Sequence, residues 1–280
     1  MGSGDVPLVF ACIAPHGSEI VPELAGRKLG AFLPTREGMR SMASRMRRAK
    51  PDTIVVASPH SLRLHRHIGV VTSENSSGSV LEGDKSIRLR AKCDVEFARA
   101  LVEDAEGAGL PVAGVNYGAD KGPLSDLAMD WGTLIPLWFL LRGTKPKPKI
   151  VVVAPSRGVP LHRNFEFGTV VGRAAERGAK RIAFVASADQ AHAHRKSGPY
   201  GYSPSAAKYD EFVVRAVNEG RLSSILELAP GVIDEAKPDS PWQMAMLAGA
   251  LSIVPMEGEV LSYQAPTYYG LLCASYSRNP

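Results

Sequence analysis

Four of the seven histidines lie just beyond short apolar runs that indicate buried strands. His16 follows one such run in CIAPHGSE, His60 follows another in TIVVASPHSL, and His192 and His194 follow a third in RIAFVASADQAHAH. A single histidine so placed is most often a packed or capping residue. In parallel α/β sheets, however, ligands gather beyond the carboxyl ends of the strands. Three runs that each deliver an imidazole there predict one shared site.

Imidazole nitrogens suit zinc, iron or copper, and a catalytic centre needs a third ligand that leaves positions open for substrate. A carboxylate would supply that ligand. No HExxH or similar local spacing selects among the acidic residues, so spacing alone leaves five candidates open: Glu19, Asp189, Asp234, Glu235 and Asp239.

Other catalytic motifs offer no better explanation. The chain has no GxSxG elbow, no Walker A loop and no GxGxxG dinucleotide loop. Its three cysteines, Cys12, Cys93 and Cys273, are far apart and form no CxxC pair, which argues against a disulfide framework and against a thiolate zinc site.

Alternating strand and helix patterns predict the fold. The expected strands are rich in β-branched residues and cover Pro7–Ala14, Thr53–Ala57, His67–Val71, Ile150–Ala154 and Arg181–Ala186. The expected helices are Thr35–Ala49, with Thr35 as N-cap, and Val95–Ala108, Asn164–Gly178, Ser205–Glu219 and Pro241–Leu251. We therefore expect a layered α/β fold with a central, mostly parallel or mixed sheet flanked by helices. We expect residues 1–280 to form a single domain.

The composition limits the kinds of partner. Among 280 residues with a net charge of +5, the one short basic cluster, Arg45–Lys50, has no interleaved aromatic residues, so we read it as a solvated helix end and expect no nucleic acid. No apolar run approaches the ~20 residues that span a bilayer, and the N-terminus lacks the pattern of a signal peptide. A cytoplasmic protein with no membrane partner is the expectation.

Several segments in order along nearly the whole chain carry a family resemblance. They are IAPHGSEIVPEL, PDTIVVASPHS, DWGTLIPLWFL, RIAFVASADQAHAHRKSGPYGYSP, KYDEFVVRAVNEG and EAKPDSPWQMAMLAGAL. Together they resemble the type III extradiol ring-cleavage dioxygenase catalytic subunits, a family that includes the protocatechuate 4,5-dioxygenase beta subunit.

The resemblance implies an enzyme that opens a catechol-like or aminophenol-like ring with O2 at non-haem Fe(II), with Mn(II) or Zn(II) as alternative metals, and releases a ring-opened semialdehyde. It implies that His16 and His60 are metal ligands, and that Glu235, or alternatively Asp239, is the carboxylate ligand. His192 would be the catalytic acid/base, with His194 as the alternative, because SADQAH stands where the family has S-G-D-L-S-H.

Residues around the substrate are less closely specified. Tyr202 and Tyr269, in loops rich in Gly and Pro, are the candidate substrate contacts, and Arg157 and Arg195 are candidate anchors for an anionic group. Trp131, Trp138 and Trp242 fall within helical apolar patterns, so we expect them in the core.

Alternative functions remain open on the sequence. They are a non-cleaving metal-binding redox or scaffold protein like the Memo-type branch of the same fold, a zinc-dependent hydrolase, and a structural partner subunit with no metal. The expected partners are a small aromatic diol and O2. Family members are often oligomers and some carry a small second subunit, so the resemblance also implies a homo-oligomer.

Overall fold

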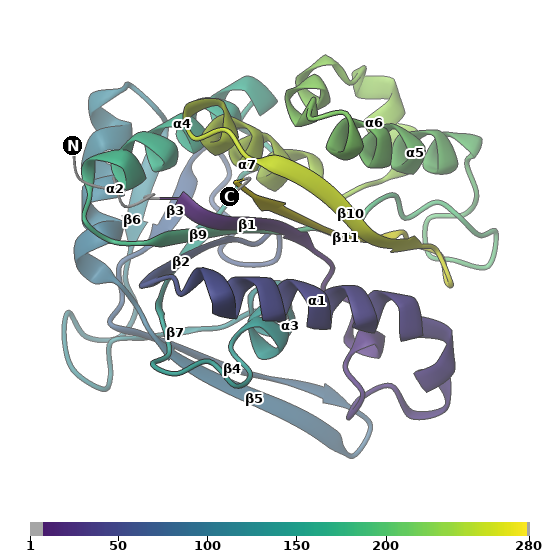
Figure 1. Cartoon of the computed structure of the whole chain (residues 1–280), viewed down its shortest axis with the longest axis horizontal. Helices are drawn as coiled ribbons and strands as arrows, with labels where there is room; N and C mark the ends of the chain where they lie inside the picture. Colours follow the sequence, from purple (N-terminus) through teal and green to yellow (C-terminus); the bar gives the residue numbers. More distant parts are fainter. Residues whose placement is uncertain (1–7, 279–280) are drawn as a thin grey trace.

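A mixed sheet of eight strands forms the centre of the computed structural model, which describes residues 8–278 (Figure 1). Its strands are β1 (Leu8–Ala14), β2 (Thr53–Ala57), β3 (Ile68–Val71), β6 (Val112–Val115), β8 (Lys149–Ala154), β9 (Ile182–Ser187), β10 (Glu257–Gln264) and β11 (Leu271–Ser277). They are ordered β10-β11-β1-β9-β2-β8-β3-β6. The four strands β1, β9, β2 and β8 run parallel, so their carboxyl ends lie at one edge.

Helices cover both faces of this sheet. They are α1 (Leu33–Ala49), α2 (Val95–Gly107), α3 (Trp131–Leu140), α4 (Leu161–Arg177), α5 (Pro204–Asn218), α6 (Pro230–Ala236) and α7 (Pro241–Ile253), with short 3-10 turns at Ser18–Ile20, Gly26–Phe32 and Leu222–Glu227. Figure 1 shows α1 and α3 on one side, and α2, α4, α5 and α7 on the other. Within residues 8–278, no helix is both long and apolar enough to cross a membrane.

The strand sequences explain this layering. In β2, Val55 packs into the core beneath α2, α4, α5 and α7, whereas Ile54 and Val56 pack toward α1 and α3. Because successive strand side chains point to opposite faces, a strand covered on both faces is apolar throughout. The fully buried runs of β2 and β9 meet that requirement.

A second, three-stranded sheet lies below α3 in Figure 1 and was not expected from the sequence. It pairs β5 (Lys85–Lys92) with β4 (Asn75–Glu82), and β4 with β7 (Asp126–Ala128). The exposed residues in β4 and β5 weaken the apolar pattern by which a strand is recognised.

Close packing against α4 fixes the position of α7, the helix that begins beside the candidate site. A Cβ built on Gly168 would lie 1.9 Å from the carbonyl oxygen of Met246, and one on Gly249 would lie 1.9 Å from that of Phe165. Only glycine permits this approach of the two backbones.

The predicted α/β fold is confirmed, and each of the five expected strands and five expected helices has a counterpart. Pro7, the expected start of the first strand, lies outside the described residues. The predicted N-cap at Thr35 is wrong, because α1 begins at Leu33. Thr35 is buried inside the helix, where its Oγ1 accepts a hydrogen bond from Gln264 Nε2 at 2.5 Å.

Candidate metal centre

Two imidazoles and one carboxylate converge beyond the carboxyl edge of the sheet. The Nε2 atoms of His16, after β1, and His60, after β2, lie 3.0 Å apart, and each lies 3.2 Å from Asp239 Oδ2. His16 and Asp239 are only 2% and 4% exposed. One ligand atom from each residue lies within 4.8 Å of the others, so the three side chains could hold one metal ion.

The end of β9, which lies between β1 and β2, orients His16. Ser187 Oγ donates to the carbonyl oxygen of Gly132 and lies 3.0 Å from His16 Nδ1. Since the serine proton is used on Gly132, the Nδ1–H of His16 must donate to the serine oxygen. Nε2 is then the nitrogen directed at the cluster, which is the arrangement that metal-binding histidines adopt when an outer partner fixes their tautomer.

The start of α3 holds His60 in place. Asp130 is the N-cap of α3 and accepts hydrogen bonds from Thr133 N (2.9 Å) and Ser58 Oγ (2.6 Å). This cap places the Trp131 ring on the His60 ring, with centroids 4.2 Å apart and an interplanar angle of 28°. The prediction of a core position for Trp131 is therefore wrong: it is 48% exposed because it covers an imidazole at the edge of a cavity.

Asp239, rather than Glu235, faces the two histidines. Glu235 lies exposed on α6, where its carboxylate accepts a hydrogen bond from Ser205 Oγ. The structure therefore does not bring Glu235, the first candidate for the carboxylate ligand, to the two histidines. Lys237 ends α6 in the left-handed conformation (φ 56°) and redirects the chain into the protein. Asp239 then accepts a hydrogen bond from the amide of Asp189 at 3.1 Å through its other oxygen, Oδ1.

The buried charges of the cluster influence one another. Burial alone would raise the pKa of Asp239, but the adjoining imidazoles of His16 and His60 hold it well below its ordinary value. Burial alone would lower the pKa of His16, but Asp189 and Asp239 raise it to about 9. Buried carboxylates beside the imidazoles therefore favour a cation between them.

His192 lies in the wall of a cavity of about 820 Å³ at this edge of the sheet. This cavity is lined by His16, His60 and His192, among others. The alternative residue, His194, does not line it; its Nε2 lies 2.8 Å from Asp210 Oδ2 on α5. The structure therefore places His192, and not His194, beside the candidate ligands.

Aromatic side chains from the nearby loops form part of the wall of this cavity. Tyr200, Tyr268 and Tyr269 line it. Tyr202, an expected substrate contact, does not; it is 59% exposed and forms a backbone bridge with His194. Of the two tyrosines singled out from the sequence, the structure places only Tyr269 at the site.

A smaller cavity of about 350 Å³ reaches the other side of the cluster, where His60 and Asp239 share its wall with Arg157 and Lys237. The Arg157 guanidinium lies over the Trp242 ring, 5.3 Å from its centroid. Arg195 lines neither cavity, and it donates to the carbonyl oxygen of Pro266 at 2.6 Å.

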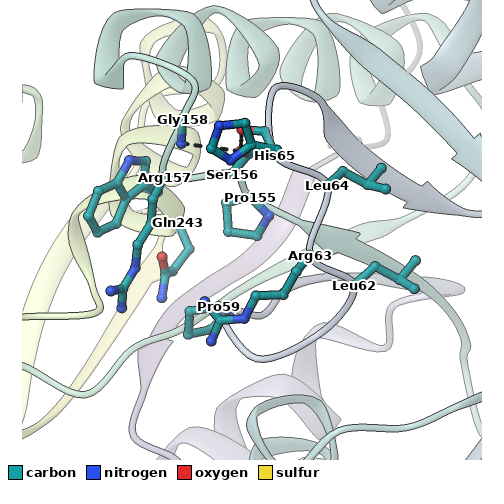
Figure 2. Close-up of a pocket in the computed structure, with 11 residues that line it drawn as sticks. Pro59, Leu62, Arg63, Leu64, His65, Pro155, Ser156, Arg157, Gly158 and Gln243 are labelled. Carbon is teal, nitrogen blue, oxygen red and sulfur yellow. Dashed lines mark hydrogen bonds between the residues drawn. The ribbon is translucent and has the colours of Figure 1, made fainter.

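Figure 2 shows an adjoining pocket, about 170 Å³ in volume, whose lining includes Arg157 and Gln243. Gln243 is buried, and its Nε2 donates to the carbonyl oxygen of Ser187 at 2.7 Å. Of the two candidate anion anchors, the structure thus places Arg157 near the metal cluster. The hydrogen bond from Gln243 connects this pocket to β9, the strand that orients His16.

Comparison with known proteins shows the family to which the chain belongs. Residues 10–271 match the family described as the catalytic LigB subunit of aromatic ring-opening dioxygenase. The chain belongs to this LigB family. It is 26% identical over 255 residues to protein CA_C1420 of Clostridium acetobutylicum, covering 90% of this chain and 54% of that protein. The chain thus spans about half the length of that relative.

Two further similarities cover more of each partner. The LigB-family chain is 24% identical over 266 residues to the 2-aminophenol 1,6-dioxygenase beta subunit of a Pseudomonas species, covering 84% of this chain and 82% of that one. The crystal structure of the uncharacterized protein JW3007 from Escherichia coli K12 superposes with a TM-score of 0.57 at 20% identity, covering 95% of this chain and 99% of that chain, and shows a shared fold.

Three residues that contribute to the site of this LigB-family protein were not predicted from the sequence as site residues: Ser187, Asp130 and Trp131. Asp130 and Thr133 form an N-capping pair in DWGT, a signal that marks the start of α3 but says nothing of His60. No local pattern reveals that Ser187 contacts His16, because 171 residues separate them.

Proposed function

We propose that this chain is an Fe(II)-dependent extradiol dioxygenase that opens a catechol-like or aminophenol-like ring with O2. One observation carries the proposal: His16 Nε2, His60 Nε2 and Asp239 Oδ2 converge on one point, and His192 lines the same cavity. In this proposal His16, His60 and Asp239 are the metal ligands and His192 is the catalytic acid/base.

The donor set fits the metal. Two imidazole nitrogens and one carboxylate oxygen form the facial triad typical of non-haem Fe(II) oxygenases, which leaves positions open. When bound, Fe(II) would supply the redox chemistry that activates O2 and would lower the pKa of a coordinated diol hydroxyl. The same donors also accept Mn(II) or Zn(II), so the test below varies the metal.

The protein's own groups perform the remaining tasks. The His192 imidazole takes the proton of a diol hydroxyl and later returns one to the ring-opened product, a contribution typically worth ~10²–10⁴-fold in rate. The exposed ring of Trp131 and the wall of tyrosines offer flat apolar surfaces against which an aromatic ring can stack.

We propose further that the chain is one catalytic domain that acts in an oligomer. The Pseudomonas relative is named as a beta subunit. Leu81, Trp131 and Tyr200 line the large cavity and are 66%, 48% and 57% exposed. A neighbouring subunit would bury this apolar surface. Size-exclusion chromatography with light scattering tests assembly, and a strictly monomeric, active protein would contradict it.

The test of the activity is anaerobic reconstitution with Fe(II), followed by a panel of catechols and aminophenols in air. Oxygen uptake and a coloured ring-opened product are measured together, with His16→Ala and His192→Ala as variants. The proposal expects stoichiometric O2 consumption that both variants lose. Tight metal binding without O2 uptake on any substrate would refute it, and hydrolysis supported by Zn(II) would identify a hydrolase.

A further inference from the structure

His192 lacks the hydrogen-bonded partner that usually orients a catalytic base. Its Nδ1 is buried and has no hydrogen-bond partner among residues 8–278, whereas its Nε2 is not among the buried unpartnered atoms. Because Nδ1 is enclosed by protein and His192 lines the cavity, Nε2 is the ring nitrogen left to face it. A base in a catalytic site is ordinarily held by a third group that hydrogen-bonds its other nitrogen. The side-chain contacts that the structure shows for this imidazole are with tyrosine rings.

The Tyr269 ring is the group that lies flat against it. The centroids of His192 and Tyr269 are 5.5 Å apart with an interplanar angle of 15°, whereas Tyr200 and Tyr268 meet the imidazole at 84° and 49°. Tyr269 is only 4% exposed, so packing restricts its own rotation. A rigid, nearly parallel neighbour limits the rotation of the imidazole about χ2, which is otherwise a broad torsion.

An acidic group anchors Tyr269 in turn. Its hydroxyl donates to Glu19 Oε2 at 2.8 Å, and Glu19 Oε1 accepts from Lys28 Nζ at 3.2 Å. A Cβ on Gly17 would lie 2.2 Å from that hydroxyl oxygen, so a side chain at this position would displace the Tyr269 hydroxyl or the loop after β1. Burial first, and then nearby carboxylates, raise the pKa of Tyr269 far above its ordinary value. The hydroxyl therefore remains a donor.

Backbone pairing holds the two rings next to each other. The amide of Gln190 donates to Gly270 O (2.8 Å), and the amide of Gly270 donates to Ala191 O (3.0 Å). The amide of His194 donates to Tyr268 O at 3.1 Å. The loop that carries His192 is thus tied to the segment that carries Tyr269.

We infer that Tyr269, anchored through its hydroxyl to Glu19, is the positioning residue that holds His192 with Nε2 facing the cavity. The inference rests on the proposed role of His192 as the acid/base. It differs from the expected role of Tyr269 as a substrate contact, because the Tyr269 hydroxyl already donates to Glu19. Ring contact takes the place that a hydrogen bond has in other sites.

The test compares Tyr269→Leu, which removes the ring, with Tyr269→Phe, which keeps the ring and removes its anchor. Tyr202→Leu, an exposed tyrosine outside the cavity, is the matched control. In the Fe(II) enzyme, loss of ring orientation should lower kcat by up to ~10²-fold with KM nearly unchanged in Tyr269→Leu. Tyr269→Phe should recover most of kcat, and Glu19→Ala should resemble Tyr269→Phe, because each removes the hydrogen bond between the two side chains.

A second readout does not depend on turnover. In the Zn(II)-loaded protein labelled with ¹⁵N-histidine, the ring nitrogens of His192, assigned with His192→Gln, should show one ordered tautomer that Tyr269→Leu disturbs and Tyr202→Leu leaves intact. A rise in KM at constant kcat, with the His192 signals unchanged, would make Tyr269 a substrate contact and overturn the inference. Unchanged kcat and unchanged signals would overturn it as well.

These outcomes separate the two proposals. If the wild-type protein cleaves no diol, the proposed function fails, and the ¹⁵N spectra alone decide whether Tyr269 orders His192. If the wild type is active and Tyr269→Leu is equally active, the function stands and the positioning role is refuted.

Discussion

Removing one buried oxygen, by Ser187→Ala, should weaken metal binding without touching a proposed ligand. Ser187 Oγ lies 3.0 Å from His16 Nδ1 and donates its own proton to Gly132. Loss of this oxygen leaves the Nδ1–H of His16 without an acceptor, although His16 is only 2% exposed. The imidazole would then be free to change tautomer or rotate, and either change turns the Nε2 lone pair away from the metal.

The expected size follows from comparable outer partners of metal ligands, whose loss typically costs ~10–100-fold in affinity, or about 1.4–2.7 kcal/mol. At a metal concentration 100 times the wild-type Kd, binding stabilises the wild-type fold by about 2.7 kcal/mol. A tenfold weaker Kd reduces this to about 1.4 kcal/mol, and a hundredfold weaker one to about 0.4 kcal/mol. The metal-induced rise in Tm should shrink in proportion.

The assay is Zn(II) binding by competition with a chromophoric chelator, paired with thermal unfolding with and without metal. Ser275→Ala is the matched control, since Ser275 is also buried in the sheet but accepts its hydrogen bond from Arg45 outside the cluster. A folded Ser187→Ala protein that keeps the wild-type Kd would show that the serine does not orient His16.

Four further substitutions test other parts of the site and the fold. Asp239→Asn should abolish tight metal binding, measured by the same competition, whereas Glu235→Gln should leave it unchanged; the reverse result would restore the sequence assignment. Arg157→Gln should raise KM for a carboxylate-bearing diol about tenfold or more and leave KM for catechol itself unaltered, and equal effects on both would exclude an anion contact. Burial alone would raise the pKa of Asp94, but neighbouring hydrogen bonds and Lys180 hold this pKa below its ordinary value. The stability that Asp94 contributes is therefore fully present above its unfolded pKa of ~3.9. This contribution is lost as the pH falls through the lower pKa of the folded state. Asp94→Asn should therefore cost about 1–3 kcal/mol in urea unfolding at pH 7 and much less near pH 3, and a gap independent of pH would refute this.

The sequence by itself determined the features that depend on neighbouring residues. The runs that became β1, β2 and β9 are apolar on both faces, which identifies buried strands, and the polar histidines directly after them had to lie at strand ends. Parallel strands place their carboxyl ends at one edge, so the sequence predicts that His16 and His60 meet there. The ordered motifs also indicated the LigB family that the comparison shows.

Only the tertiary structure decided which carboxylate joins them. Glu235 and Asp239 stand four positions apart with similar chemistry, and the left-handed turn at Lys237 sends one to the surface and the other into the cluster. Local preference does not predict that turn, because non-glycine residues adopt positive φ only rarely.

The same limit applies to the partners of the site residues. Ser187 on His16, Trp131 on His60 and Tyr269 on His192 each join segments that are distant in the chain. Local propensity and periodicity report on contacts within a few residues, whereas these contacts exist because strands and loops far apart in the sequence are packed at one edge of a single sheet.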